Sequence, residues 1–216
     1  MVFFVINHEL HILLHLNFYL KNMVLHHAVL TYGLLTGIIF CETGLVVTPI
    51  LPGDSIIFTV GALSAQHFFN LPLLIFLLSL AAILGDTINY RIGYSLGPKV
   101  FHQKNSKWLN PEYLKRTHQF YEKHGGKTIL LGRFIPIIRT FVPFVAGIGR
   151  MRYFSFWIFN AIGGLLWISL GVLGGYFFGN LPMIQNNFSL FLLGIVLISL
   201  IPVVLEVLKT YQIHHR

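Results

Sequence analysis

The chain has 216 residues, of which 55% are hydrophobic and only 10% are charged, whereas soluble domains carry roughly 25% charged residues. This composition excludes a water-soluble surface around a single core, and the apolar runs reach the roughly 20 residues that cross a bilayer. The formal net charge of +8 is also common in nucleic-acid-binding proteins, but here Lys and Arg lie in short connections between apolar runs, as in loops held on the cytoplasmic side of a membrane. The sequence therefore predicts an all-α polytopic membrane protein that binds no nucleic acid.

The N-terminal region, residues 1–27, is predicted to form one helix over residues 8–22. His8, His11 and His15 share a stripe of that helix, which either lies on the membrane surface or forms a first membrane helix. Both readings stay open. Three histidines can hold a metal, but little carboxylate is nearby, and we expect neither a metal nor a cofactor.

The membrane domain, predicted over residues 28–208, begins with an interrupted segment. Residues 28–50 are apolar except for Glu42, and a helix too short to cross a bilayer alone resumes up to residue 65. A helix, a break and a half-helix are typical of a re-entrant hairpin, which we place at about residues 42–65. The residues that break the segment are Pro49, Pro52 and Gly53.

A membrane-spanning helix is predicted next, over residues 71–90, and it carries Asp86 close to its end. Residues 97–127 are the one hydrophilic stretch, with Lys and Arg in excess over Glu. We expect this stretch to be a cytoplasmic connector.

A second interrupted segment, residues 128–149, has basic residues on both flanks. By the positive-inside tendency both of its ends lie on the same side of the membrane, which predicts a second re-entrant hairpin. The residues that interrupt it are Arg133, Pro136, Arg139 and Pro143.

Two more spans follow at residues 154–179 and 188–205, and residues 209–216 form a cytoplasmic tail. Glycines recur every fourth residue in two of the helices, a spacing that lets helices in lipid approach closely. These predicted packing positions are Gly33, Gly37, Gly171, Gly175 and Gly179.

Five ionisable residues lie within or at the ends of the apolar segments: Glu42, Asp54, Asp86, Arg133 and Arg139. Inserting one such charge at mid-bilayer costs about 2.5 to 3.5 kcal/mol if it is unpaired and faces lipid. Four of them together would cost on the order of 10 kcal/mol. Such groups must therefore face one another or water. A purely structural tie would pair Glu42 and Asp54 with Arg139 and Arg133, but buried pairs seldom stabilise more than apolar residues do, and we favour a functional role.

Two opposed hairpins, one in each half of an inverted-repeat-like chain, predict a polar cavity near the midplane. There Arg133 and Arg139 would bind the phosphate of an anionic headgroup. The carboxylates of Glu42, Asp54 and Asp86 would repel that headgroup unless protonated. This conflict predicts that they carry protons and couple substrate movement to the proton gradient.

At these positions the sequence resembles the DedA family, also called SNARE-associated or VTT-domain membrane proteins. The resemblance extends from about residue 28 to residue 180 and rests on the stretches 42–55, 85–93 and 132–147 taken together. It implies a multi-pass protein of the bacterial cytoplasmic membrane with two facing re-entrant loops, dependent on the proton-motive force. It further implies translocation of lipids such as undecaprenyl phosphate or phosphatidylethanolamine, with Glu42, Asp54, Arg133 and Arg139 at the family's functional positions.

Two other functions remain open. A membrane-embedded lipid phosphatase could use the same arginines, with Asp54 as nucleophile, but no His accompanies the Arg motif to activate it. A membrane-organising protein that transports nothing would leave the buried charges without a task. We expect a flippase or scramblase rather than an enzyme, with membrane lipids and protons as partners, and the sequence is compatible with a homo-oligomer.

Overall fold

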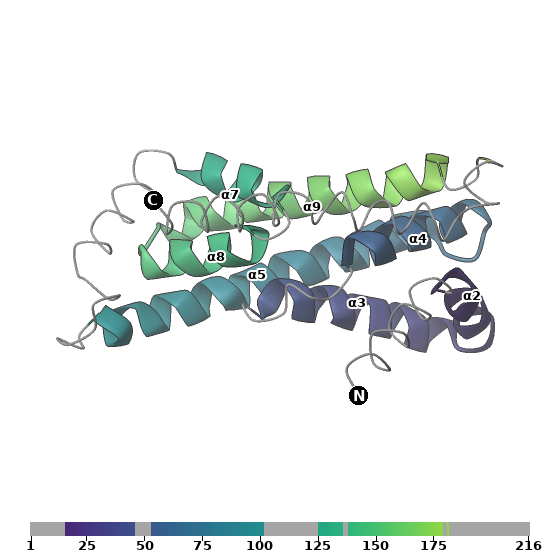
Figure 1. Ribbon diagram of the computed structural model, residues 1–216, viewed down its shortest axis with the longest axis horizontal. Helices are drawn as coiled ribbons and strands as arrows, with labels where there is room; N and C mark the ends of the chain where they lie inside the picture. The colour runs from purple at the N-terminus through teal and green to yellow at the C-terminus, as the bar shows by residue number, and fades with distance from the viewer. Residues whose placement is uncertain (1–15, 46–52, 102–124, 136–137, 179–180, 182–216) are drawn as a thin grey trace, which may run out of the picture. The chain divides into compact units, whose positions relative to one another are not determined.

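The structure, a computed structural model, describes residues 16–45, 53–101, 125–135, 138–178 and 181. The regular elements of these residues are all α-helices, with no strands among them (Figure 1). In chain order they are α2 (Leu16–His26), α3 (Ala28–Gly44), α4 (Gly53–Ala65), α5 (Leu71–Phe101), α7 (Gly126–Gly132), α8 (Ile138–Ile148) and α9 (Tyr153–Phe178).

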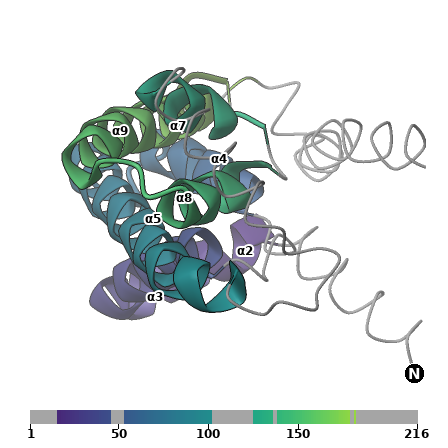
Figure 2. The same cartoon turned by 90° about the vertical axis from the view of Figure 1, so that its left-hand side faces the viewer.

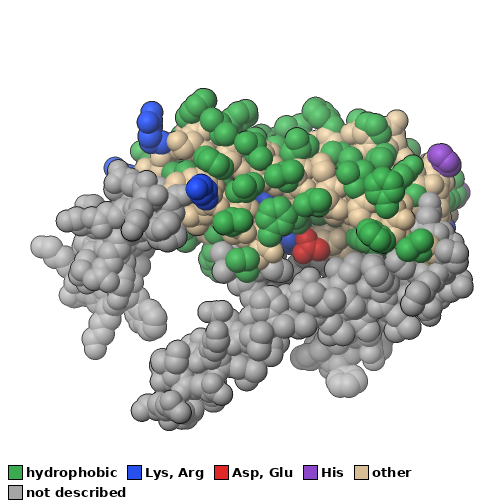
Figure 3. Space-filling view, turned by 90° about the horizontal axis from the view of Figure 1, so that it is seen from above, with side chains coloured by type: hydrophobic (Ala, Val, Ile, Leu, Met, Phe, Trp, Pro, Cys, Tyr) green, Lys and Arg blue, Asp and Glu red, His purple; other side chains and the backbone are tan. Residues whose placement is uncertain are grey.

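Two of these helices are long and apolar enough to cross a bilayer. They are Leu71–Gly97 within α5 and Tyr153–Phe178, the whole of α9. Large apolar side chains such as Phe76 and Leu170 point outward from both helices, each more than 60% exposed. In Figure 3 the described part of the surface is accordingly mostly hydrophobic, with acidic and basic side chains together near its middle and further Lys or Arg side chains toward one end. An exterior of this kind suits lipid better than water.

The described residues fall into two compact units, and α3, α5 and α9 each contribute residues to both. Unit 1 takes its residues from Met1–Leu34, Pro52–Leu74 and Ser169–Arg216, and unit 2 from Leu35–Leu51 and Ile75–Ile168.

Unit 1 is held together by close contact between α4 and the C-terminal part of α9. A Cβ atom at Gly61 would overlap the backbone of Val172, and one at Gly175 would overlap the backbone of Phe58. Gly171 likewise faces the side chain of Ile57. The predicted packing role of Gly171 and Gly175 is therefore confirmed, because only a residue without a side chain permits these approaches.

Unit 2 is built around α5. Gly85 lies against Thr43 near the end of α3, while Gly93 and Gly147 bring α5 and α8 into backbone contact. Figure 1 and Figure 2 both show α5 running beside α8 and beside the end of α3. Helix α7 lies against α9, with Gly126 packed on Phe159. Close approach of these helices fixes the positions of the polar side chains that they carry.

The observed helices agree with most of the predicted segments and differ in three respects. Helix α5 continues to Phe101, into the stretch predicted as a connector. Pro143, predicted to break the second segment, lies inside α8. The prediction of a break there is wrong, because proline is tolerated in helices of membrane proteins where neighbouring groups satisfy the freed backbone. Nothing described lies within 4 Å of a Cβ placed on Gly33 or Gly37, so their predicted packing role is wrong within the described residues.

The two interrupted segments are each represented by short helices, α4 with 13 residues, α7 with 7 and α8 with 11. None is long enough to cross a bilayer alone, since a helix rises 1.5 Å per residue. Re-entrant hairpins and an inverted repeat stay predictions. The predicted features outside the described residues are the histidine stripe, Pro49, Pro52, Pro136, most of the connector, Gly179, the span 188–205 and the tail.

Candidate functional site

The centre of unit 2 contains an ion pair between Arg133, directly after α7, and Asp86 of α5. Both side chains are 5% exposed. The guanidinium also donates a hydrogen bond from Nη2 to Oδ1 of Asn160 on α9, over 2.7 Å. Arg133 is therefore held by two helices that are far apart in the sequence.

A second ion pair joins Arg139, in the first turn of α8, to Glu42 near the end of α3. The carboxyl side chain is 1% exposed and the guanidinium side chain 10% exposed. The two pairs are neighbours: the guanidinium carbons of Arg133 and Arg139 lie 5.9 and 4.7 Å from the ring centre of Trp167. Two arginines, two carboxylates and one indole thus form a single buried group, called here the charge cluster.

Helix α9 supplies a cradle for the arginines. Asn160, Gly163, Gly164 and Trp167 follow the spacing i, i+3, i+4 and i+7, which places them on one face of a helix. A Cβ at Gly164 would lie 2.7 Å from Nη1 of Arg133, so a side chain there would displace the guanidinium. Asn160 is itself oriented, because its Nδ2 donates to the carbonyl of Ile83 over 3.0 Å and its Oδ1 is thereby directed at the arginine.

Asn89 of α5 joins the two helices that carry the second ion pair. Its Nδ2 donates to the carbonyl of Thr43 over 3.2 Å and to the carbonyl of Thr140 over 2.8 Å. Thr43 lies in the last turn of α3 and Thr140 in the first turn of α8, next to Glu42 and Arg139 respectively. The amide therefore fixes the distance between the helix ends on which that ion pair depends.

The cluster balances its charge, since two guanidinium groups meet two carboxylates. Pairing lowers the cost of burying charges, but desolvation still offsets most of the Coulomb gain. Among the described residues, Nη1 of Arg133 and Oδ1 of Asn89 are buried and lack a hydrogen-bond partner. A buried donor without an acceptor is costly and is the kind of atom that a water molecule or a substrate oxygen satisfies.

Four of the five predicted charged residues converge in this cluster: Glu42, Asp86, Arg133 and Arg139. The fifth, Asp54, lies in the first turn of α4 and belongs to unit 1. Arg133 pairs with Asp86, a partner that the sequence did not suggest, and the suggested tie between Arg139 and Glu42 is present. Gly53 begins α4, as expected of a residue at a break. No cluster of metal-binding side chains occurs in the described parts of the chain.

The sequence reasoning missed the neutral members of the site, which are Asn89, Asn160, Gly163, Gly164 and Trp167. Asn89 and Asn160 are each completely buried polar amides within long apolar helices, and that placement was a usable signal, since polar side chains in apolar helices usually face other helices. The helical spacing of Asn160, Gly164 and Trp167 was a second signal.

Comparison with known proteins identifies the family of the chain. The VTT domain family matches residues 48–177. The chain is 50% identical to Protein DedA of Escherichia coli strain K12, over 91% of each chain. It is 40% identical to an uncharacterized membrane protein, ML0287, of Mycobacterium leprae, over 83% of this chain and 80% of that one. It is also 38% identical to the inner membrane protein YqjA of Escherichia coli strain K12, over 70% of this chain and 69% of that one. No solved structure gives a significant match. The matched domain, the extent of these identities and the two long apolar helices together make the chain a membrane protein of the DedA family, with a VTT domain.

Proposed function

We propose that the protein moves a phosphate-headed lipid, such as undecaprenyl phosphate or phosphatidylethanolamine, between the leaflets of a bilayer, and that protons are coupled to this movement. The observation that carries the proposal is the charge cluster: two arginines, each already paired to a carboxylate, in the apolar interior of a membrane protein. Intramembrane charges of this kind mark substrate and proton pathways more often than they stabilise a fold.

The arginines suit phosphate for a geometric reason. A guanidinium presents planar donors that match the oxygens of a phosphate as well as those of a carboxylate. Phosphate can therefore replace a carboxylate at Arg139 or Arg133 without leaving the guanidinium unpaired. Nη1 of Arg133 is buried and lacks a partner among the described residues, so it is a donor that a phosphate oxygen would satisfy.

Protons enter through charge balance. The cluster holds equal numbers of positive and negative groups, so an anionic headgroup brings excess negative charge into an apolar region. Protonation of Glu42 or Asp86 removes that excess and frees an arginine at the same time. Release of the proton on the other side restores the ion pair and expels the lipid. A proton gradient supplies about 1.4 kcal/mol per pH unit, and a membrane potential about 2.3 kcal/mol per charge per 100 mV.

Asp54 is a further proton-carrying candidate from the sequence, at the start of α4 in unit 1. The name of the inner membrane protein YqjA and the apolar helices support a multi-pass location in the bacterial cytoplasmic membrane. We also propose that the chain is not an enzyme and that its partners are membrane lipids and protons.

The test is transport between leaflets by purified protein in liposomes, with fluorescent lipids whose outer-leaflet fraction is bleached by an impermeant reductant. The proposal expects faster exchange of lipids with a phosphate headgroup than of a glycolipid without phosphate, and a rate that changes when a pH gradient is imposed. Rates equal to those of protein-free liposomes for every lipid would reject it.

The same preparation distinguishes the phosphatase alternative. Release of inorganic phosphate from a lipid phosphate, in proportion to the amount of protein, would show that the arginines serve hydrolysis. We expect no release while exchange proceeds, because neither arginine of the charge cluster has a described His beside it as a general base.

A further inference from the structure

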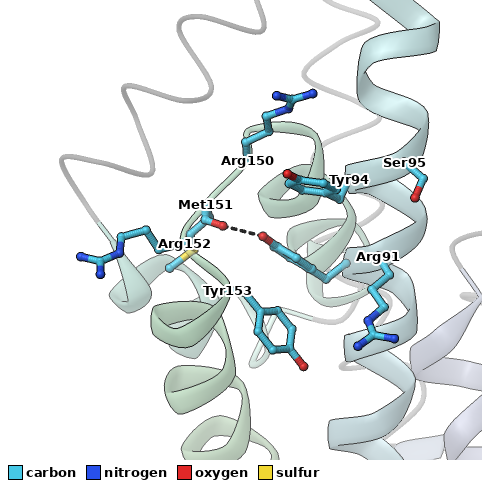
Figure 4. A pocket seen from close by; sticks show the side chains of 8 residues that line it. Arg91, Tyr94, Ser95, Arg150, Met151, Arg152 and Tyr153 are labelled. Carbon is cyan, nitrogen blue, oxygen red and sulfur yellow. Dashed lines mark hydrogen bonds between the residues drawn. The ribbon is translucent and has the colours of Figure 1, made fainter.

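A second group of cationic side chains lies in unit 2, where α5 approaches the turn between α8 and α9. A cavity of about 490 Å³ opens there, and Figure 4 shows the side chains around it. The lining residues are Tyr90, Arg91, Tyr94, Ser95, Arg150, Met151, Arg152 and Tyr153. Tyr90 and Met151 are buried and form the floor, while the three arginines are exposed at the rim.

The rim differs from the charge cluster in its charge balance. Arg91, Arg150 and Arg152 form no ion pair with any residue that the structure describes, and none of the lining residues is acidic. Figure 4 shows their side chains extending in different directions around the tyrosines, with Arg152 turned away from them. Mutual repulsion of like charges favours such a spread. An anion bound between the arginines would draw their guanidinium groups together.

Arg150 occupies a backbone position at which glycine is the most common residue. Helix α8 ends in a turn in which Arg150 N donates to Gly147 O and Met151 N donates to Ala146 O, each over 3.0 Å. This is the Schellman arrangement, whose left-handed residue is usually glycine. Arg150 has a φ of 52°, a left-handed conformation that is strained for a residue with a side chain. The strained turn directs the guanidinium over the ring of Tyr94, at 5.4 Å from its centre.

The strained turn is also fixed from α5. Tyr90 donates its hydroxyl hydrogen to the carbonyl of Met151 over 2.5 Å, and its ring stacks on Phe156 of α9 at 4.4 Å between centres. Gly147 packs on the backbone of Tyr90. The floor of the cavity is therefore an aromatic surface, and the turn that carries Arg150 and Arg152 is anchored to it.

The cavity lies at the ends of both candidate membrane spans, since one ends at Gly97 and the other begins at Tyr153. Tyrosine and arginine are the residues found at the level of lipid headgroups, and basic pockets between membrane helices bind phosphorylated headgroups. We infer that the rim arginines and the tyrosine floor form a surface site for the phosphate of a lipid headgroup. The phosphate contacts the arginines and the glycerol region of the lipid covers the tyrosines. The inference stands independently of the transport proposal.

The decisive variant is Arg150→Gly, because it removes the guanidinium and relieves the left-handed strain in the same step. The measurement is equilibrium binding of dihexanoyl phosphatidic acid to the full chain in detergent, by titration calorimetry. We expect Arg150→Gly and Arg152→Gln each to weaken binding about tenfold or more, which is the loss of one charge-assisted contact. Lys127→Gln, which removes another exposed positive charge, from α7, is the matched control and leaves the affinity unchanged.

Several results would overturn the inference. Wild-type affinity in Arg150→Gly would show that the turn is only structural, and equal weakening by Lys127→Gln would show that the protein attracts anions without a defined site. Inorganic phosphate that binds as tightly as phosphatidic acid would assign the site to free phosphate instead of a lipid. The titration is repeated in a Glu42→Gln/Arg139→Gln background. Unchanged binding there separates this site from the charge cluster, whereas its loss would mean that the lipid binds at the cluster.

Discussion

Removing Asp86 and Arg133 singly and together tests whether the first ion pair is a coupled, buried unit. Asp86→Asn keeps the shape of the side chain but leaves the guanidinium without its carboxylate. Breaking a buried pair by removing one partner costs about 3 to 5 kcal/mol. Asn160 still accepts a hydrogen bond from Arg133, which favours the lower end of that range. The neighbouring Arg139, over the same indole ring, adds repulsion and favours the higher end.

Arg133→Met removes the other partner and leaves a buried carboxylate, again at about 3 to 5 kcal/mol. The double variant contains neither charge. If the two sites were independent, their costs would add, but if they form a pair the double variant is destabilised no more than either single one. We therefore expect a coupling energy of about 3 kcal/mol, at the upper end of the range for residues in contact.

The measurement is the free energy of unfolding of the purified protein in mild detergent, titrated with a denaturing detergent and followed by tryptophan fluorescence. The control cycle pairs Asp86→Asn with Lys127→Gln, an exposed change on α7, and should be additive within about 0.5 kcal/mol. If the destabilisations by Asp86→Asn and Arg133→Met also added within about 0.5 kcal/mol, that result would refute the ion pair and the reasoning built on it.

Three further predictions address the residues that support the charge cluster. Gly147→Leu should unfold the protein at markedly lower temperature, because its Cβ would overlap the backbone of Tyr90, whereas Gly174→Leu, with nothing described within 4 Å, should leave the thermal midpoint nearly unchanged; equal midpoints would contradict the close helix contact. Asn160→Leu should slow lipid exchange in liposomes by tenfold or more while the protein remains folded, because the amide positions a guanidinium; a wild-type rate would remove it from the site. Trp167→Leu should also slow exchange, since its ring lies under both guanidinium groups, and the half-exposed Trp157 gives the control, Trp157→Leu, which should not; indistinguishable rates for the two variants would exclude a specific role.

The sequence located the charged residues of the site because charges are costly in apolar segments and therefore conspicuous. It could not identify the partner of Arg133. A charge's depth along its helix can be read from the sequence, but the neighbours of that helix depend on packing. Gly85, Gly93 and Gly147 decide that packing by allowing close contact, and none of them belongs to the four-residue glycine repeats from which packing positions were predicted.

The neutral members of the site were missed for an energetic reason. A buried amide such as Asn89 or Asn160 costs much less than a charge in an apolar helix, so a single Asn in a hydrophobic run attracts little notice.

At Pro143 the sequence instead predicted a break that the structure does not contain. Proline was taken as a break, but α8 continues through Pro143, as membrane helices do where neighbouring groups satisfy the freed backbone.

The most direct measurement compares lipid exchange by the wild-type protein with exchange by the charge-neutral double variant Glu42→Gln/Arg139→Gln. Both partners of the second ion pair lose their charge together, so no buried charge is left unpaired and the variant should fold. The account predicts a protein with near wild-type stability that no longer exchanges phosphate-headed lipids faster than empty liposomes. Wild-type exchange by this folded variant would show that the second ion pair of the cluster takes no part in moving lipid.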